Sequence, residues 1–215
     1  MNTHTAIATD VNVSTKKISV ITDGIDCEKV SPKNYISRTM GQIITTASAD
    51  VPLKGLDFTL QAIPALIKDF PYLRLMIIGA PRIGGHTERL IQKLKIEANI
   101  VYKTNLTKEE IAIEYANSNI AVVSSLYEGF GFPVGEAMAC SVPLIATNVA
   151  SIPEITGNFA ELIPACDSKS IERSIRNILS NPEKYQTRAD KGRQHIIDNF
   201  DWKKIAQSYD SLIYK

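Results

Sequence analysis

The sequence has little of what would mark a membrane-spanning, secreted or nucleic-acid-binding protein. No apolar run in its 215 residues approaches the roughly 18 residues needed to cross a bilayer. The first residues lack the charged stretch followed by an apolar stretch that is typical of a secretory signal. Lys and Arg total 24 against 23 Asp and Glu, so no excess charge favours nucleic acid or an anionic membrane. We therefore expect a cytoplasmic protein without a nucleic-acid partner, and leave peripheral contact with a membrane open.

Metal-binding and redox patterns are also missing. The three cysteines, Cys27, Cys140 and Cys166, are odd in number and far apart, which fits neither a disulfide framework nor a zinc site and suggests a reducing compartment. No Asp-x-Asp follows a predicted strand, which argues against a metal-bridged site. No Gly-x-Gly-x-x-Gly follows the first strand, which disfavours a dinucleotide redox enzyme. We expect neither a metal nor a resident cofactor.

What the sequence does contain is a regular alternation of strand and helix patterns from Gly41 onward. Short apolar runs alternate with longer segments in which apolar residues recur every three or four positions. The predicted strands are residues 42–47, 73–78, 100–102, 120–123, 144–146 and 161–163. The predicted helices are residues 54–69, 86–98 and 133–141, and four more that open at Thr107, Asp167, Pro182 and Asp201. This alternation implies a doubly wound, parallel, Rossmann-like α/β sheet of about six strands.

Three local signals refine this prediction. Thr107 and Glu110 have the spacing of a capping box, which predicts a helix start. Pro64 lies inside a predicted helix, where its missing N–H should produce a kink. Residues 18–21 are β-prone and are closed by Asp23, so we expect a short strand there.

The most informative stretch runs from Ile120 to Asn148. The buried-strand pattern of residues 120–123 leads into a glycine-rich loop and then to Pro133, which suits the first position of a helix. Pro143 cannot continue that helix, so the helix should end near Ser141. The unit predicted is a strand, a glycine-rich turn, a helix and a second strand. The N-terminus of such a helix offers free N–H groups to a phosphate.

Two carboxylates frame this unit. Glu128 follows the strand, and Glu136 falls in the first turn of the predicted helix, whose side chains lean back toward its N-terminus. Both should point into the crevice above the carboxyl ends of the strands, where open α/β sheets bind ligands. Carboxylates accept hydrogen bonds from paired sugar hydroxyls, so a phosphate site between two acids suits a nucleotide-sugar. An isolated pair of this kind is more often a solvated loop charge and a partner of the helix dipole.

The residues Glu-Gly-Phe-Gly-Phe-Pro-Val-Gly-Glu-Ala-Met-Ala-Cys, from Glu128 to Cys140, resemble the E-x7-E signature of the retaining glycosyltransferases of family 4, the glycosyl transferases group 1. The likeness continues into the segments that begin at Pro143 and Pro153. In that family a segment similar to Asp23-Gly-Ile-Asp ends the acceptor domain and begins the linker. The resemblance therefore implies that this chain is the C-terminal, donor-binding half of a GT-B architecture.

The same resemblance divides the chain into three parts. Residues 1–40 would be a remnant of the acceptor domain and linker, residues 41–198 the nucleotide-sugar-binding domain, and residues 199–215 a C-terminal helix. In the family this helix returns toward the acceptor domain, so we expect part of its apolar face to be exposed here.

The function implied is hexosyl transfer, with retention and without metal, from a nucleotide diphosphate sugar to an unknown glycan or lipid-linked acceptor. A separate chain is a possible source of the acceptor domain. The alternatives are a nucleotide-sugar-binding or regulatory module without turnover, and an interaction protein whose pocket is vestigial.

The resemblance also assigns roles to residues. Glu128 would hold the sugar near its reacting carbon, and Glu136 would bind the ribose diol. Lys54, followed by Gly55, looks like the Lys-Gly pair that grips the donor's phosphates, and a solvated lysine is the plain alternative. The remaining donor-binding positions would be Gly129, Phe130, Gly131, Phe132, Pro133 and Val134 around the helix start, and Tyr102, Lys103 and Thr104 after the third strand. We interpret Phe130 and Phe132 as packing residues rather than stacking platforms.

Two positions depart from the family's pattern. The family usually has an Arg five residues before the Lys, where this chain has Ala49. A charge-assisted hydrogen bond of about 1.5–3 kcal/mol would be lost with that Arg, and Arg82 is a candidate substitute. Ser141 replaces a Gly of the family and should change only the C-cap of its helix.

Overall fold

Short strands alternate with helices through the part of the chain that the computed structural model describes, which is residue 14 and residues 18–33, 35–48 and 50–213. The strands are β1 (Gln42–Thr46), β2 (Arg74–Ile78), β3 (Ile100–Lys103), β4 (Ile120–Val123), β5 (Leu144–Thr147) and β6 (Glu161–Ile163). The α-helices are α2 (Leu56–Asp69), α3 (His86–Leu94), α4 (Lys108–Ala116), α5 (Phe132–Ala139), α6 (Ile152–Thr156), α7 (Ser168–Ser180), α8 (Pro182–Phe200) and α9 (Trp202–Ile213). Two short 3-10 helices are η2 (Pro52–Lys54) and η3 (Glu97–Asn99).

The six strands form one sheet in the order β3-β2-β1-β4-β5-β6, and every pair is parallel. The predicted doubly wound, Rossmann-like sheet is therefore confirmed. The direction of the strand order reverses between β1 and β4, so the crevice of an open α/β sheet lies above the carboxyl ends of these two strands.

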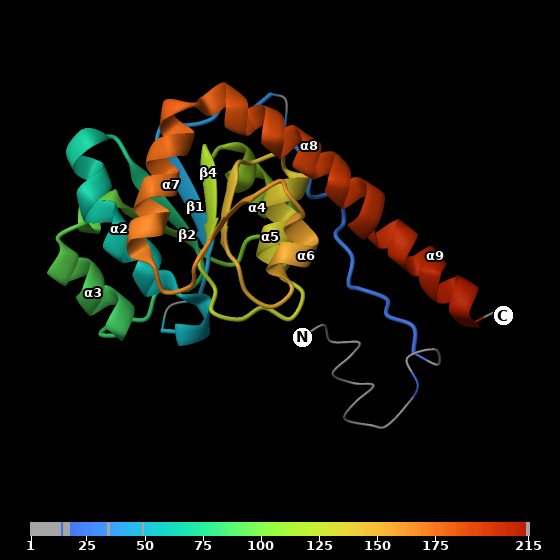
Figure 1. Cartoon of the computed structure of the whole chain (residues 1–215). Helices are drawn as coiled ribbons and strands as arrows, with labels where there is room; N and C mark the ends of the chain where they lie inside the picture. Colours follow the sequence, from blue (N-terminus) through green and yellow to red (C-terminus); the bar gives the residue numbers. More distant parts are fainter. Residues whose placement is uncertain (1–13, 15–17, 34, 49, 214–215) are drawn as a thin grey trace.

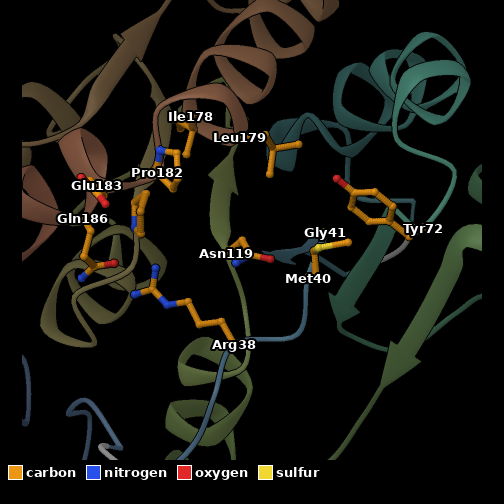
Figure 2. Close-up of a pocket in the computed structure, with 11 residues that line it drawn as sticks. Arg38, Met40, Gly41, Tyr72, Asn119, Ile178, Leu179, Pro182, Glu183 and Gln186 are labelled. Carbon is orange, nitrogen blue, oxygen red and sulfur yellow. The ribbon is translucent and has the colours of Figure 1, made fainter.

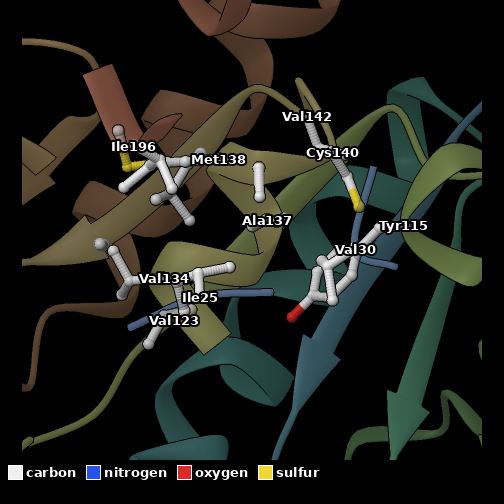
Figure 3. Packing of buried hydrophobic residues seen from close by; sticks show 14 of the residues in the cluster. Ile25, Val30, Tyr115, Val123, Val134, Ala137, Met138, Cys140, Val142 and Ile196 are labelled. Atoms are coloured by element: carbon white, nitrogen blue, oxygen red, sulfur yellow. The ribbon is translucent and has the colours of Figure 1, made fainter. Parts of the chain in front are cut away.

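Both faces of the sheet are buried, and alternate residues of each strand enter different cores. Ile43 and Ile120 pack with α2, α3 and α7, whereas Ile44 and Ala121 pack with α4, α5 and α8 on the other face. Figure 1 shows α2, α3 and α7 on one side of the sheet and α4 and α5 on the other. Figure 3 shows part of the second core, in which Met138 of α5 lies against Ile196 of α8. Full burial of each large aliphatic side chain contributes about 1.5–3 kcal/mol, so the sheet depends on both helical layers.

The segment before β1 also enters the second core. Ile25 is buried there, and its N–H donates to the carbonyl of Phe200 at 2.8 Å while its carbonyl accepts from the N–H of Trp202 at 3.0 Å. A Cβ on Gly135 of α5 would lie 2.6 Å from Cδ1 of Ile25, so the glycine leaves room for this side chain. Residues near the two ends of the described chain are thus held together.

Several predicted boundaries are confirmed, others differ from the structure by a few residues, and one predicted strand is absent. The capping box opens α4, because the Thr107 side chain accepts from the Glu110 N–H at 3.2 Å and the Glu110 carboxylate accepts from the Thr107 N–H at 2.7 Å. The helix predicted from residue 54 begins at Leu56, because Gly55 has φ +61° and acts as its N-cap. The helix predicted to reach residue 98 ends at Leu94, where Lys95 turns left-handed.

The prediction of a strand at residues 18–21 is wrong, because these residues form no strand. Val20 is 58% exposed, and β-prone residues need a neighbouring strand and a buried face to form one. Helix α2 continues through Pro64 without a break, and the kink expected there stays a prediction.

Helix α9 leads away from the sheet in Figure 1 and contains no buried residue. Four of its large apolar side chains, Trp202, Tyr209, Leu212 and Ile213, are exposed, which confirms the exposure predicted for this helix. Among the helices of the described residues, none has both the length and the apolar content needed to span a bilayer.

Candidate functional site

The site begins where the loop between β1 and α2 meets the end of β4. Gly55 lies against the backbone of Ser124, and a Cβ at Gly55 would overlap the Ser124 carbonyl oxygen. The Ser124 hydroxyl donates to the carbonyl of Gly55 at 2.9 Å and accepts from the hydroxyl of Thr59 at 2.9 Å. Only glycine combines this close approach with a φ of +61° without strain. Gly55 therefore fixes Lys54 beside the carboxyl end of β4.

Lys54 and Glu128 form a salt bridge at that point, with Lys54 Nζ 2.7 Å from Glu128 Oε1. The same carboxylate oxygen accepts from the Ser125 hydroxyl at 2.7 Å. Glu128 is only 8% exposed, whereas the Lys54 side chain is 33% exposed. The structure thus brings together two of the residues predicted for the site, and the buried acid has both a cation and a hydroxyl as partners.

Ser151, in the turn before α6, fixes the conformation of the loop after Glu128. Its hydroxyl contacts the carbonyl oxygens of Glu128 at 3.0 Å and Phe130 at 2.8 Å. Among the described residues, no acceptor is present for the N–H groups at positions 129–132. These N–H groups precede and begin α5, so they form an anion-binding arrangement at a helix N-terminus.

Glycine suits positions 129 and 131 of this loop for different structural reasons. Gly131 is the N-cap of α5 and has φ +97°, which a residue with a side chain rarely adopts. Gly129 has no such φ, and a Cβ there would meet nothing within 4 Å. Its exposed backbone borders open space, which is what a close approach of a ligand would require.

The aromatic residues of the loop pack against one another. The rings of Phe130 and Phe132 meet edge-on with centroids 5.0 Å apart, and Phe130 also lies 6.1 Å from Phe200. Phe130 is half-buried against the core, whereas Phe132 is 48% exposed. The packing interpretation is confirmed for Phe130 and holds for only part of the Phe132 ring.

A cavity of about 440 Å³ opens beside Glu128. One wall is formed by the segment before Ile25, and the others by the glycine-rich loop, the turn into α6 and the end of α8. The lining residues are Val20, Ile21, Thr22, Asp23, Tyr127, Glu128, Gly129, Phe130, Ala150, Ser151, Glu154, Ile155 and Phe200.

Glu136 lies elsewhere on α5 and in a different environment. The helix begins at Phe132, one residue earlier than predicted, so Glu136 is its fifth residue and lies beyond the first turn; Pro133 takes the second position. Burial raises the pKa of Glu136 to about 7, against an opposing effect of Lys108. No hydrogen bond to its carboxylate is made among the described residues, and it does not line the cavity beside Glu128.

The neighbour of Glu136 is Tyr115 of α4, which is fully buried and whose pKa is raised first by that burial and then by the charge of Glu136. The Tyr115 hydroxyl lies 3.2 Å from Oγ1 of Thr46, the last residue of β1, and 3.3 Å from the carbonyl of Pro133. Glu136 is therefore also at the carboxyl-end edge of the sheet, on the side of α4.

The residues predicted after the third strand lie at the end of β3, which β2 and β1 separate from β4. Lys103 Nζ lies 2.6 Å from Oε1 of the buried Glu114, so this lysine is already paired. Tyr102 is half-buried and its pKa is raised mainly by that burial, while Thr104 is exposed. The assignment of these residues to a nucleobase stays a prediction.

Two further positions, Ala49 and Arg82, bear on the binding of the donor's phosphates near Lys54. Ala49 lies outside the described residues. Arg82 is largely exposed, and its Nε lies 3.8 Å from Asp50 Oδ2. Asp50 in turn accepts from the N–H and the hydroxyl of Thr87 and from the N–H of His86, at the start of α3. These bonds, the two from Thr87 first, hold the pKa of its carboxyl below the ordinary value. The substitution of the missing Arg by Arg82 stays a prediction.

Two serines that position the site, Ser125 and Ser151, were not predicted from the sequence. Ser125 bonds the Glu128 carboxylate and Ser151 bonds the loop carbonyls. In the sequence, Ser125 is only the second polar residue after a predicted strand, and Ser151 only a polar residue two positions before Pro153. Across the residues that the structure describes, no three Cys, His, Asp or Glu side chains gather in a way that could hold a metal ion.

The sequence matches a known family and several curated proteins over most of its length. The family glycosyl transferases group 1 matches residues 29–195. The MMP alpha-(1->4)-mannosyltransferase of Mycolicibacterium hassiacum is 32% identical over 203 residues, which is 93% of this chain and 49% of that protein. The chain thus spans about half the length of the curated relatives it matches.

Solved structures show the same fold. The C-terminal domain of a glycosyl transferase group 1 family protein (LpcC) from Francisella tularensis superposes with a TM-score of 0.72 at 22% identity, over 83% of this chain and 99% of that one. Anabaena Alr3699/HepE, solved in complex with UDP and glucose, gives a TM-score of 0.83 at 18% identity, over 99% of this chain and 60% of that one.

Proposed function

Because the chain belongs to the glycosyl transferases group 1 family, we propose that it forms the donor-binding half of a hexosyltransferase. It would hold a nucleotide diphosphate sugar above the carboxyl ends of β1 and β4. A mannosyltransferase among the relatives and a structural neighbour solved with UDP and glucose support a hexosyl donor. The acceptor would be a glycan or a lipid-linked molecule, held by a domain outside this chain.

The Lys54–Glu128 pair is the observation that carries this proposal. It stands beside an open cavity and next to the N–H groups of residues 129–132, for which the described residues provide no acceptor. A diphosphate in this place would take Lys54 and the N–H groups as partners. Glu128 would then be released from Lys54 and could accept hydrogen bonds from the sugar hydroxyls.

In the proposed reaction, the bond between the anomeric carbon of the sugar and the diphosphate oxygen breaks, and a bond from the same carbon to an acceptor oxygen forms with retention. Lys54 and the loop N–H groups stabilise the charge that develops on the departing diphosphate, so no metal is required. The proton of the acceptor hydroxyl passes to that diphosphate. Such a transfer requires no general base from this chain.

Glu136 would bind the two hydroxyls of the ribose. A carboxylate that accepts from a diol must be ionised, whereas burial holds the pKa of Glu136 at about 7. Ribose binding would therefore favour loss of its proton. The affinity for a nucleotide-sugar should rise between pH 6 and pH 8, and Glu136→Gln should remove this rise.

Ligand-observed NMR with uridine, guanosine and adenosine diphosphate sugars tests the proposal. One class is expected to bind, at a dissociation constant of about 1 mM for half of a cleft. Glu128→Ala should weaken the sugar nucleotide more than the bare nucleoside diphosphate, and Glu136→Gln should weaken both. Glu97→Gln, an exposed change in η3, is the control and should change neither.

Each role has an outcome that would contradict it. Equal losses for the two ligands in Glu128→Ala would remove the contact between Glu128 and the sugar. An unchanged affinity in Glu136→Gln would remove the ribose contact. If none of the three nucleotide classes bound the wild-type chain, the donor-binding proposal itself would be wrong.

A further inference from the structure

A second pocket lies at the opposite end of the sheet from Lys54 and Glu128. It has a volume of about 440 Å³ and is lined by residues that precede three strands: Gly41 before β1, Asn119 before β4 and Pro143 before β5. The end of α7 and the first turn of α8 form its other side (Figure 2). Strands of four or five residues span about 13–17 Å, so this pocket is separate from the candidate donor site.

Arg38 brings a half-buried positive charge to the pocket. Its Nη2 donates to the carbonyl of Ser141 at 2.7 Å, and among the described residues no carboxylate lies within salt-bridge distance of its guanidinium. Burial lowers the pKa of Arg38, and the more distant charge of Asp190 opposes this effect. A guanidinium has five N–H donors, so most of those of Arg38 are left for a ligand or for water.

Asn119 also lines this pocket, and its side chain carries an acceptor that is buried and unpaired among the described residues. Its Oδ1 is buried and is the one buried side-chain polar atom without a hydrogen-bond partner in the part of the chain described. In Figure 2 its amide points toward Met40 and Gly41, and the guanidinium of Arg38 points toward Gln186. Buried polar atoms are nearly always paired, so this atom indicates a missing donor.

The rest of the wall is largely apolar. Ile178 and Leu179 come from the last turn of α7, and the partly exposed side chains of Met40 and Tyr72 stand at the rim. The one acidic lining residue is Glu183, in the first turn of α8. The pocket therefore combines one cation, one unpaired acceptor and an apolar surface.

We propose that this pocket binds a small organic carboxylate with an apolar body and one hydroxyl or amino group. The planar guanidinium of Arg38 matches a carboxylate. The hydroxyl or amino group would donate to the buried Oδ1 of Asn119 once a rotation of that amide turns the oxygen toward the ligand. The apolar body would lie against Leu179 and Tyr72. A single cation beside Glu183 suits a monoanion and is a poor match for a doubly charged phosphate. The volume is within the range of about 300–1,000 Å³ that is usual for small-molecule sites.

Amide chemical shifts of the full chain, titrated with 3-phenyllactate, test this proposal without any nucleotide. The probe should move the resonances of Gly41, Asn119 and Leu179. Phenyllactamide lacks the carboxylate and should bind about tenfold or more weakly. 3-Phenylpropionate lacks the hydroxyl and should bind about threefold or more weakly. If the three probes bound alike, or moved only residues near Glu128, the proposal would be overturned.

Paired variants separate the pocket from general effects of charge. Arg38→Met should abolish most of the binding, and Arg74→Met, an exposed change at the same edge of the sheet, should leave it unchanged. Leu179→Trp fills the pocket while keeping the bond from Arg38 to Ser141, so it should block the probe even if Arg38→Met folds poorly. Equal behaviour of the two arginine variants, or wild-type binding by Leu179→Trp, contradicts the proposal.

A dilution series without probe tests whether a second copy of the chain occupies the pocket instead. Resonances of Met40 and Tyr72 that shift with protein concentration would show that a second copy of the chain covers the rim, and would overturn the small-molecule assignment. The expected result is that these resonances do not change with dilution.

Discussion

The loop after β4 and the second turn of α5 each carry one glutamate of the same motif, but the two side chains have opposite surroundings. Glu128 is buried and paired with Lys54 and Ser125. Glu136 is desolvated without a hydrogen-bond partner among the described residues, and its pKa is raised to about 7. The first acid helps to hold the fold together, whereas the second reduces stability whenever it is ionised. The difference supports the proposal that Glu136, rather than Glu128, takes its hydrogen-bond partner from a bound ligand.

The largest effect is expected at Gly55, which fixes Lys54 next to Glu128. Gly55→Ala adds a Cβ that overlaps the carbonyl of Ser124 at a φ of +61°. We expect a loss of at least about 3 kcal/mol of unfolding free energy, from left-handed strain and overpacking. Urea denaturation measures this loss. Gly129→Ala is the matched control, because its Cβ would meet nothing, and a loss there as large as at Gly55 would contradict the steric account.

The next effect concerns Glu136 and depends on pH. Its folded pKa of about 7 lies above the ordinary value of 4.5. The folded state therefore holds more protons between these values, so the free energy of unfolding should fall as pH rises from about 4.5 to 7. Gln at this position cannot ionise, so Glu136→Gln should be more stable than wild type by about 2–3 kcal/mol at pH 8 and similar to it at pH 4.

Urea denaturation at the two pH values checks this, with the exposed change Glu97→Gln as the control. A stability gain in Glu136→Gln that was the same at both pH values would mean that ionisation is not its cause.

A smaller effect is expected when the Lys54–Glu128 pair is broken. Lys54→Met leaves the buried carboxylate with Ser125 alone, and we expect a loss of about 1–2 kcal/mol because the lysine is partly exposed. A double-mutant cycle with Glu128→Gln measures the coupling energy between the two residues. The same cycle for Lys54 and Glu136 should give a coupling near zero, and a comparable value would erase the distinction between the two acids.

The smallest effect lies at the other end of α5, where a change should affect neither acid. Ser141 follows the C-cap of the helix with φ +55°, a conformation that favours glycine, and its carbonyl rather than its hydroxyl bonds Arg38. Ser141→Gly should raise the unfolding free energy by about 0.5–1 kcal/mol. Thermal unfolding with and without a nucleotide-sugar checks this, and a changed ligand affinity would show that the two ends of α5 are not independent.

Features set by neighbours in the chain could be predicted from the sequence. The strands could be read from their apolar runs, and Thr107 and Glu110 marked a helix start because both partners lie within one turn. The strand expected at residues 18–21 is absent because pairing and burial, rather than propensity alone, decide strand formation.

The contacts that build the site could not be predicted from the sequence, because they join residues far apart in the chain. Lys54 and Glu128 are 74 residues apart, and only the parallel order of β1 and β4 brings them together. The motif predicted two acids at one edge of the sheet, but it could not show that one would be paired and the other left without a partner.

The hydrogen bonds that join Ile25 to Phe200 and Trp202 have a consequence for how the domain is made. During synthesis Ile25 is translated well before residues 200–202, whose backbone it bonds. Until then, the space that Gly135 leaves open on α5 stays unfilled. Closing so long a loop is entropically unfavourable and slow, so the domain should complete its core only after α8 has left the ribosome.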